Sequence, residues 1–148
     1  TGFKPAFVMV KRIDTIEDWC MFDNARSPSN PIVRRHRANT DGAEDVETGT
    51  NNTLNFTDTG FTWLGTGGGT NNGSGTYVYM AFAGGMDSIS DYNDTGSLDS
   101  RVKANTTYGQ SIVSYTGVAA SSGTIGHGLG TVPEMMFFNS TVPSNPKT

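Results

Sequence analysis

The sequence predicts an all-β fold, and three observations support this prediction. The chain of 148 residues holds 19 glycines, while charged residues make up only 16%, below the usual share of about 25%. Short apolar runs are separated by turns rich in Gly, Asn and Thr, which is the pattern of short strands. A turn, a proline and an apolar run also occur twice. This composition argues against a helical bundle, and an apolar share of 34% can fill a core.

The first strands are predicted near the start of the chain. Residues 6–10 form a continuous apolar run after Pro5, which is typical of a strand buried on both faces. Residues 19–22 predict a second short strand. The pair Ile32-Val33 begins a short edge strand, and we expect its continuation over residues 34–37 to face water.

A β-hairpin is the clearest local element. The segments Leu54-Asn55-Phe56 and Phe61-Thr62-Trp63 flank a turn over residues 57–60 that ends in glycine. With this turn, Phe56 faces Phe61 and Leu54 faces Trp63. Four large side chains are therefore expected on one face of the hairpin.

The segment GTGGGTNNGSG, residues 65–75, is interpreted as a flexible connection. Its glycines resemble those of a phosphate-binding loop, but the Gly-Lys-Ser/Thr sequence is missing and no helical pattern follows. A loop without a nucleotide is the favoured interpretation.

Residues 76–82 predict a long strand with two distinct faces. One face holds Val78, Met80 and Phe82, and the other holds Tyr77 and Tyr79. We expect Phe82, together with Trp63, to lie in the core. Tyr77 and Tyr79 are expected to reach a surface or a partner chain.

Two stretches of the chain are nearly the same. Residues 2–5 (GFKP) precede the apolar run at 6–10, and residues 128–133 (GLGTVP) precede the apolar run at 135–138 (MMFF). Aligning Pro5 with Pro133 gives an offset of 128 residues (133 − 5). Self-similarity of this kind indicates a tandem module.

The repeat suggests a division into three parts. Residues 1–85 are expected to form one β-sandwich module with a truncated start, and residues 86–110 a polar linker. Residues 111–148 then open a second module, with strands near 111–115, 124–127 and 135–138. In the alternative interpretation, residues 111–148 complete the sheets of the first module.

The candidate binding residues are three arginines. Arg34, Arg35 and Arg37 can bind anionic sugars or phosphate through their planar guanidinium groups. Acidic residues follow closely, and mutual pairing on a surface loop is the simpler account. These residues are Asp41, Glu44, Asp45 and Glu47.

Other reactive side chains have simpler structural roles. His127 lies in a turn between glycines, where backbone hydrogen bonding is favoured, and His36 is expected to be solvated. Cys20 lies between Trp19 and Met21 and is expected to be a small core residue. Asp87, Asp91, Asp94 and Asp99 carry oxygen ligands that Ca²⁺ prefers, but a solvated linker is favoured. We therefore expect no catalytic residue, metal or cofactor, and no enzymatic activity.

Charge and hydropathy exclude two kinds of partner. The net charge is −4 and the isoelectric point is about 4.9, so the chain has no basic footprint for nucleic acid. No apolar run approaches the roughly 20 residues that span a bilayer. We expect neither nucleic-acid binding nor membrane insertion.

Several phrases together resemble a known module. TGFKPAFVMVKR, WCMFDNAR and TYVYMAFAG are followed by VKANTTYGQSIVSYTG and TIGHGLGTVP. In this order they resemble a module repeated in virion proteins of marine bacteriophages. The resemblance implies an antiparallel β-sandwich of the jelly-roll or lectin-like kind, a location in the virion and no catalytic residues.

The resemblance implies a structural component of a virion appendage, a tail or head fibre. Adhesion to a host surface or glycan would use the polar loops at 27–31, 39–53 and 65–75, with many copies raising avidity. The expected partners are other virion proteins or copies of the chain in a homo-oligomer. A capsid-decorating or cementing protein is the alternative, and a polysaccharide depolymerase is a third. An exposed apolar patch would favour cementing, and polar loop tips with aromatic residues would favour adhesion.

Overall fold

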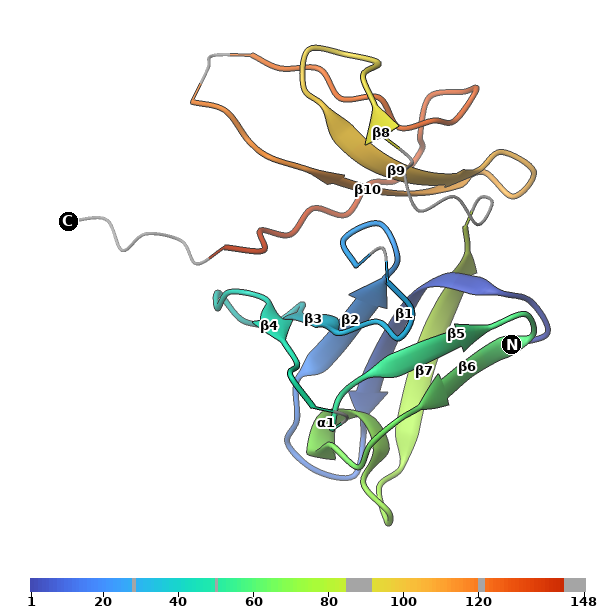
Figure 1. Ribbon diagram of the computed structural model, residues 1–148, viewed down its shortest axis with the longest axis vertical. Coiled ribbons are helices and arrows are strands. Elements are labelled where there is room, and N and C mark those ends of the chain that lie inside the picture. The colour runs from blue at the N-terminus through green and yellow to red at the C-terminus, as the bar shows by residue number, and fades with distance from the viewer. Residues whose placement is uncertain (28, 50, 85–91, 120–121, 143–148) are drawn as a thin grey trace.

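The protein is an antiparallel all-β structure, as the sequence predicts. The computed structural model describes residues 1–27, 29–49, 51–84, 92–119 and 122–142 (Figure 1). Within these ranges the only helix is the single turn α1 (Gly68–Asn71). The strands are β1 (Pro5–Arg12), β2 (Trp19–Asp23), β3 (Arg34–Arg37), β4 (Asp45–Val46), β5 (Leu54–Thr57), β6 (Gly60–Trp63), β7 (Tyr77–Ala83), β8 (Tyr92–Asn93), β9 (Ser100–Asn105) and β10 (Gln110–Tyr115).

The first half of the chain forms two layers. Five strands make one sheet in the order β4-β3-β2-β1-β7, and the β5–β6 hairpin lies across one face of it (Figure 1). The side chains between the layers form the core. Its fully buried members are Val8, Val10, Cys20, Phe22, Ile32, Leu54 and Phe56. The expectation that Cys20 is a core residue is therefore confirmed.

The hairpin has the predicted register. Leu54 pairs with Trp63 and Phe56 with Phe61, so these four side chains share one face. The ring of Trp63 packs edge-on against that of Phe22, with 5.4 Å between the ring centroids. The hairpin therefore covers the sheet with large apolar groups, and Trp63 packs against the core as expected.

The strand expected from Ile32 begins two residues later, at Arg34. Ile32 instead exchanges backbone hydrogen bonds with Leu54, with N–O distances of 2.7 and 3.2 Å. Because Ile32 is fully buried, this bridge joins the hairpin to the sheet at the edge of the core.

The two faces of β7 hold the residues that the sequence predicts. The core lies on the tyrosine face, however, and not on the face with Phe82. Val10 of β1 pairs with Tyr79, and Val8 pairs with Ala81, so the tyrosine face looks toward the hairpin. Phe82 lies on the outer face and is 38% exposed, and its assignment to the core was wrong. Alternation fixes which residues share a face, but the covering layer decides which face is buried.

The glycine-rich segment 65–75 is folded, contrary to the expected flexible connection. Its centre is α1, where Thr70 is 1% exposed. The hydroxyl of Tyr77 donates to the carbonyl of Gly68 and accepts from the N–H of Asn72, both at 2.8 Å. A Cβ atom on Gly67 would lie 1.9 Å from Oδ1 of Asn52, so glycine is needed for this close approach.

The second half of the chain forms a separate sheet. Its order is β10-β9-β8, and β10 confirms the strand predicted over residues 111–115. Strands β8 and β9 fall inside the expected linker, so the interpretation of residues 92–105 as a polar connection was wrong. Residues 124–127 contribute only an isolated bridge between Ile125 and Gly96.

Residues 135–138 form no strand, although their composition predicts one. This segment is extended coil, with 65–91% of each side chain exposed. A strand needs a neighbour for its backbone N–H and C=O groups, and no neighbour for it appears among the described residues.

The core assignment predicts a large difference between two leucines. Leu54→Ala should lower the free energy of unfolding by about 3 kcal/mol, because it removes a fully buried side chain from between the layers. Leu64→Ala is the matched control, because Leu64 is 38% exposed and its loss should cost under about 1 kcal/mol. Urea unfolding followed by tryptophan fluorescence measures both values. Equal costs would contradict the two-layer core.

Candidate functional site

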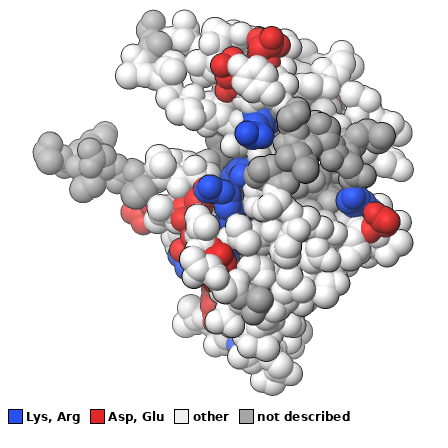
Figure 2. Space-filling view, viewed as in Figure 1, with Lys and Arg blue, Asp and Glu red and all other residues white. Residues whose placement is uncertain are grey.

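The three candidate arginines belong to an ion-pair network at one edge of the sheet. They lie on β3, where Arg35 pairs in register with Asp45 of β4. Figure 2 shows blue and red side chains next to each other over this edge. The ion pairs are Arg34 with Glu44, Arg35 with Asp45 (2.7 Å) and Glu47 (3.4 Å), and Arg37 with Asp45 (2.7 Å) and Asp18 (3.2 Å). Mutual pairing, the simpler account of the cluster, is confirmed, whereas ligand binding stays a prediction.

Arg35 is partly buried within this network. Burial lowers the pKa of Arg35, but the hydrogen bond to Asp45 and the nearby negative charges outweigh it and leave the pKa raised. The guanidinium therefore stays charged. Burial also raises the pKa of the Cys20 thiol, and the positive charges of Arg35 and Arg37 only partly oppose this. A buried thiol with a raised pKa is a poor nucleophile.

A second carboxylate, Asp23, organises the turn after β2. Asp23 is 3% exposed and accepts hydrogen bonds from the backbone N–H groups of Ala25 (3.0 Å) and Arg26 (2.7 Å). Its other oxygen accepts from Nε of Arg26 at 2.5 Å. Arg26 also donates to Glu44 at 3.0 Å, and Glu44 in turn binds Arg34. One chain of charges therefore ties the turn to β3 and β4.

Neither Asp23 nor Arg26 is among the residues predicted from the sequence. A signal was present, because an aspartate at the end of a strand commonly accepts from backbone N–H groups two and three residues later. The arginine at the third position, in the phrase DNAR, is the natural counter-charge.

The two histidines have different environments. His36 is 2% exposed, so the expectation that it is solvated was wrong. It pairs in register with Met21, and neither ring nitrogen has a hydrogen-bond partner among the described residues. Nδ1 of His127 accepts from the backbone N–H of Leu129 at 3.1 Å, which confirms the predicted backbone hydrogen bond.

Of the four aspartates considered as Ca²⁺ ligands, the structure describes Asp94 and Asp99. Asp87 and Asp91 lie outside the described residues. In the part of the chain that the structure describes, no group of three or more His, Cys, Asp or Glu residues could hold a metal ion. Asp99 instead takes part in a hydrogen bond with Tyr92, which, together with some desolvation, raises the pKa of the Tyr92 hydroxyl.

The three loops predicted to contact a host surface make hydrogen bonds, ion pairs or packing contacts with the rest of the protein. In the loop at 27–31, the side-chain amide of Asn30 donates to the carbonyl of Phe56 (2.9 Å) and accepts from its N–H (3.0 Å). The loop at 39–53 carries the paired acids, and the segment 65–75 packs through Thr70. Residues 28 and 50 lie outside the described residues.

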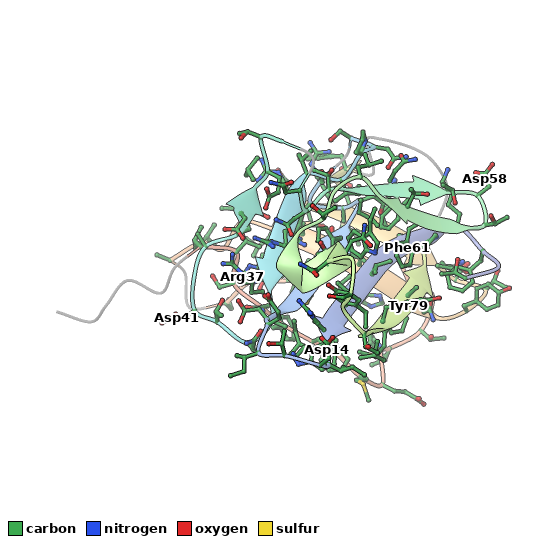
Figure 3. The ribbon with its side chains drawn as sticks, turned by 90° about the horizontal axis from the view of Figure 1, so that it is seen from below. Asp14, Arg37, Asp41, Asp58, Phe61 and Tyr79 are labelled. Atoms are coloured by element: carbon green, nitrogen blue, oxygen red, sulfur yellow. The ribbon has the colours of Figure 1, made fainter. Side chains whose placement is uncertain are left out.

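The candidate tyrosines differ in accessibility. Tyr77 is partly buried: its hydroxyl makes two hydrogen bonds within the chain and its ring packs against the core. A contact of its exposed part with a partner stays a prediction. Tyr79 remains 48% exposed and contacts Phe61 of β6 at a centroid distance of 5.2 Å (Figure 3). A partner contact at Tyr79 stays a prediction.

The outer side of β7 is an exposed apolar surface that the sequence analysis did not anticipate. Val78, Met80 and Phe82 are 38–44% exposed there. Phe82 is also in ring contact with Phe7, at a centroid distance of 5.8 Å. With residues 135–138, this gives the chain two apolar segments available for contact with protein, and we take them as the candidate interface.

The fold and these surfaces define an antiparallel β-sheet protein with an ionic edge and an apolar edge. The chain belongs to the family described as a domain of unknown function (DUF7483), which matches residues 1–85 and 87–147. No curated protein matches the sequence, and no solved structure matches it. The break between the two matched segments falls at the start of the expected linker, while the division into modules stays a prediction.

Among the described residues, no helix is long and apolar enough to cross a membrane.

The network around Asp23 predicts a strong effect of one carboxylate. Asp23→Ala should lower the free energy of unfolding by about 3 kcal/mol, because it leaves Arg26 without its nearest counter-charge and two backbone N–H groups without an acceptor. Asp58→Ala is the control, because Asp58 is 95% exposed, 3.7 Å from Lys4 and apart from Arg37 (Figure 3). It should change stability by less than about 0.5 kcal/mol. Chemical unfolding at pH 7 compares them, and a small cost for Asp23→Ala would refute the structural role.

Proposed function

We propose that the chain is a structural β-module of a bacteriophage virion appendage, a tail or head fibre. Its proposed function is to assemble with other virion proteins or with copies of itself. The observation that carries the proposal is the exposure of two apolar surfaces, the outer face of β7 and residues 135–138, which lie outside the buried core. Exposed apolar surface of this kind marks protein contact sites.

The two edges of the five-stranded sheet differ in how well they suit contact with another protein. One edge is β4, which has two residues and is surrounded by ion pairs. Short, charged edges resist further strand pairing. The other edge is β7, which has seven residues and no charged side chain. Contact with another protein is therefore favoured at β7 and opposed at β4.

The resemblance of the sequence phrases to a repeated virion module supports the location in a phage particle. Taken alone, the exposed apolar surface favours a capsid-cementing protein. The resemblance, which implies a tail or head fibre, is what favours the fibre over it.

Adhesion is a second candidate function, favoured by one observation. Tyr108 is 70% exposed in the turn between β9 and β10, and Tyr92 on the neighbouring strand β8 is 64% exposed. An exposed tyrosine offers an apolar ring face and a hydroxyl, which suits a sugar ring. Weak sites of this kind gain avidity when many copies lie on one particle.

Labelling of intact particles tests the structural proposal. Antibody against residues 1–84, detected with gold in the electron microscope, should decorate thin projections or the tail tip. Label spread evenly over the head would assign the chain to capsid decoration instead. Particles without label, when the antibody binds the isolated chain, would overturn a structural role in the virion.

A tyrosine variant tests the adhesive role. Tyr108→Ala should reduce binding of the multivalent chain to host cells or a glycan array by about tenfold or more, because each site loses roughly 1 kcal/mol of ring contact. Tyr108→Phe keeps the ring and should stay within about threefold of the unchanged chain. Unaltered binding by Tyr108→Ala would exclude this turn as the adhesive site.

A further inference from the structure

Residues 134–138 have the sequence of a strand, but no strand in the described part of the chain pairs with them. Four consecutive large apolar side chains, Met135 to Phe138, are each at least 65% exposed. Unpaired backbone next to apolar side chains is a template for strand pairing. This segment is therefore suited to contact another sheet.

The internal repeat indicates which strand it would pair with. Aligning Pro133 with Pro5 places residues 134–138 on residues 6–10 of β1. In the folded chain, β1 pairs antiparallel with β7, with Met9 opposite Met80 and Val8 opposite Ala81. A segment of this sequence type is thus already a partner of β7.

Among the described residues, no strand pairs with the second edge of β7. β1 occupies one edge, and β7 ends the sheet order on the other side. Alternate side chains are exposed on both of its faces, with Tyr79 at 48% and Met80 at 43%. A further strand can be added there without displacing any described strand.

With its C-terminal end held beside β4, the segment does not reach β7 of its own chain. The carbonyl of Thr141 accepts from the N–H of Glu44, beside β4, at 3.0 Å, and Figure 1 shows the segment running toward β4. β4 and β7 are four strand spacings apart, or about 19 Å. The three residues from Phe138 to Thr141 span at most about 11 Å.

We propose that residues 134–138 of one copy add, antiparallel, to the open edge of β7 in a second copy. The inference rests on the proposed function and names the partner and surface of its assembly. Because each copy offers both a donor segment and an acceptor edge, the contact is head-to-tail and continues from copy to copy.

The alternation of side chains along residues 134–138 matches the two faces of β7 in the second copy. By the alignment with β1, Met136 and Phe138 correspond to Val8 and Val10, which share the core face. Met135 and Phe137 correspond to Phe7 and Met9, which pair beside Phe82 and Met80 on the outer face. The added strand would therefore cover exposed apolar groups on both sides of β7.

The oligomeric state of the whole chain, measured by sedimentation over a range of concentrations, tests the proposal. The unchanged chain should form species larger than a monomer as concentration rises. Phe137→Lys should weaken this association at least tenfold, and it should leave the fold intact because Phe137 is 91% exposed. Val132→Lys is the matched control, because Val132 is 86% exposed but precedes the added strand, and it should associate like the unchanged chain.

Disulfide trapping identifies the acceptor edge. A Phe137→Cys chain mixed with chains carrying Val78→Cys, Met80→Cys or Phe82→Cys should give one strongly cross-linked pair under mild oxidation, because paired strands bring Cα atoms within disulfide range. Mixing with Val46→Cys, on exposed β4, should give little product. The native Cys20 is 1% exposed and does not compete.

The outcomes separate this inference from the proposed function. A chain that stays monomeric, or cross-linking to β4 as readily as to β7, overturns strand addition. Association that Phe137→Lys leaves unchanged also overturns it, although labelled projections on the particle would still support the structural role. Unlabelled particles would count against the structural role even if strand addition occurs in solution.

Discussion

Burial of one face of the sheet beneath the β5–β6 hairpin is the contact on which the rest of the structure depends. A two-stranded hairpin is marginal in water by itself, and a sheet with one uncovered apolar face is no better. The register of Leu54 with Trp63, and the edge-on contact of Trp63 with Phe22, join the two. Once the hairpin covers the sheet, it decides which face of each strand is buried and which face is exposed.

The charged residues then define one boundary of the sheet. Arg35 and Asp45 pair across β3 and β4, while Asp23 and Arg26 carry the chain of charges to Glu44. Partly buried pairs of this kind do more to fix geometry than to add stability, because desolvation offsets much of their attraction. Here they hold a two-residue edge strand in place and cover its open side with charge. The arginines are thereby committed to internal partners.

The opposite boundary has a different character. β7 ends the sheet with apolar side chains on both faces and an unpaired edge among the described residues. Proteins usually protect such edges with charge, proline or a covering segment, and the lack of charge on β7 supports the strand addition proposed above. The contrast between β4 and β7 gives the molecule a direction, which is what a repeating assembly requires.

Local patterns in the sequence predict the strands β1, β2, β5, β6, β7 and β10, the register of the hairpin and the core role of Cys20. These patterns suffice because alternation and turn chemistry are local. The sequence did not show that β8 and β9 lie within an acidic, polar segment, since strands poor in apolar residues have no clear period. Only the folded chain shows that the tyrosine face of β7 looks inward, that His36 is buried, and that residues 135–138 have no strand partner in the part of the chain that the structure describes. Each of these depends on which distant segment lies opposite, and the alternation of side chains along one strand does not specify that segment.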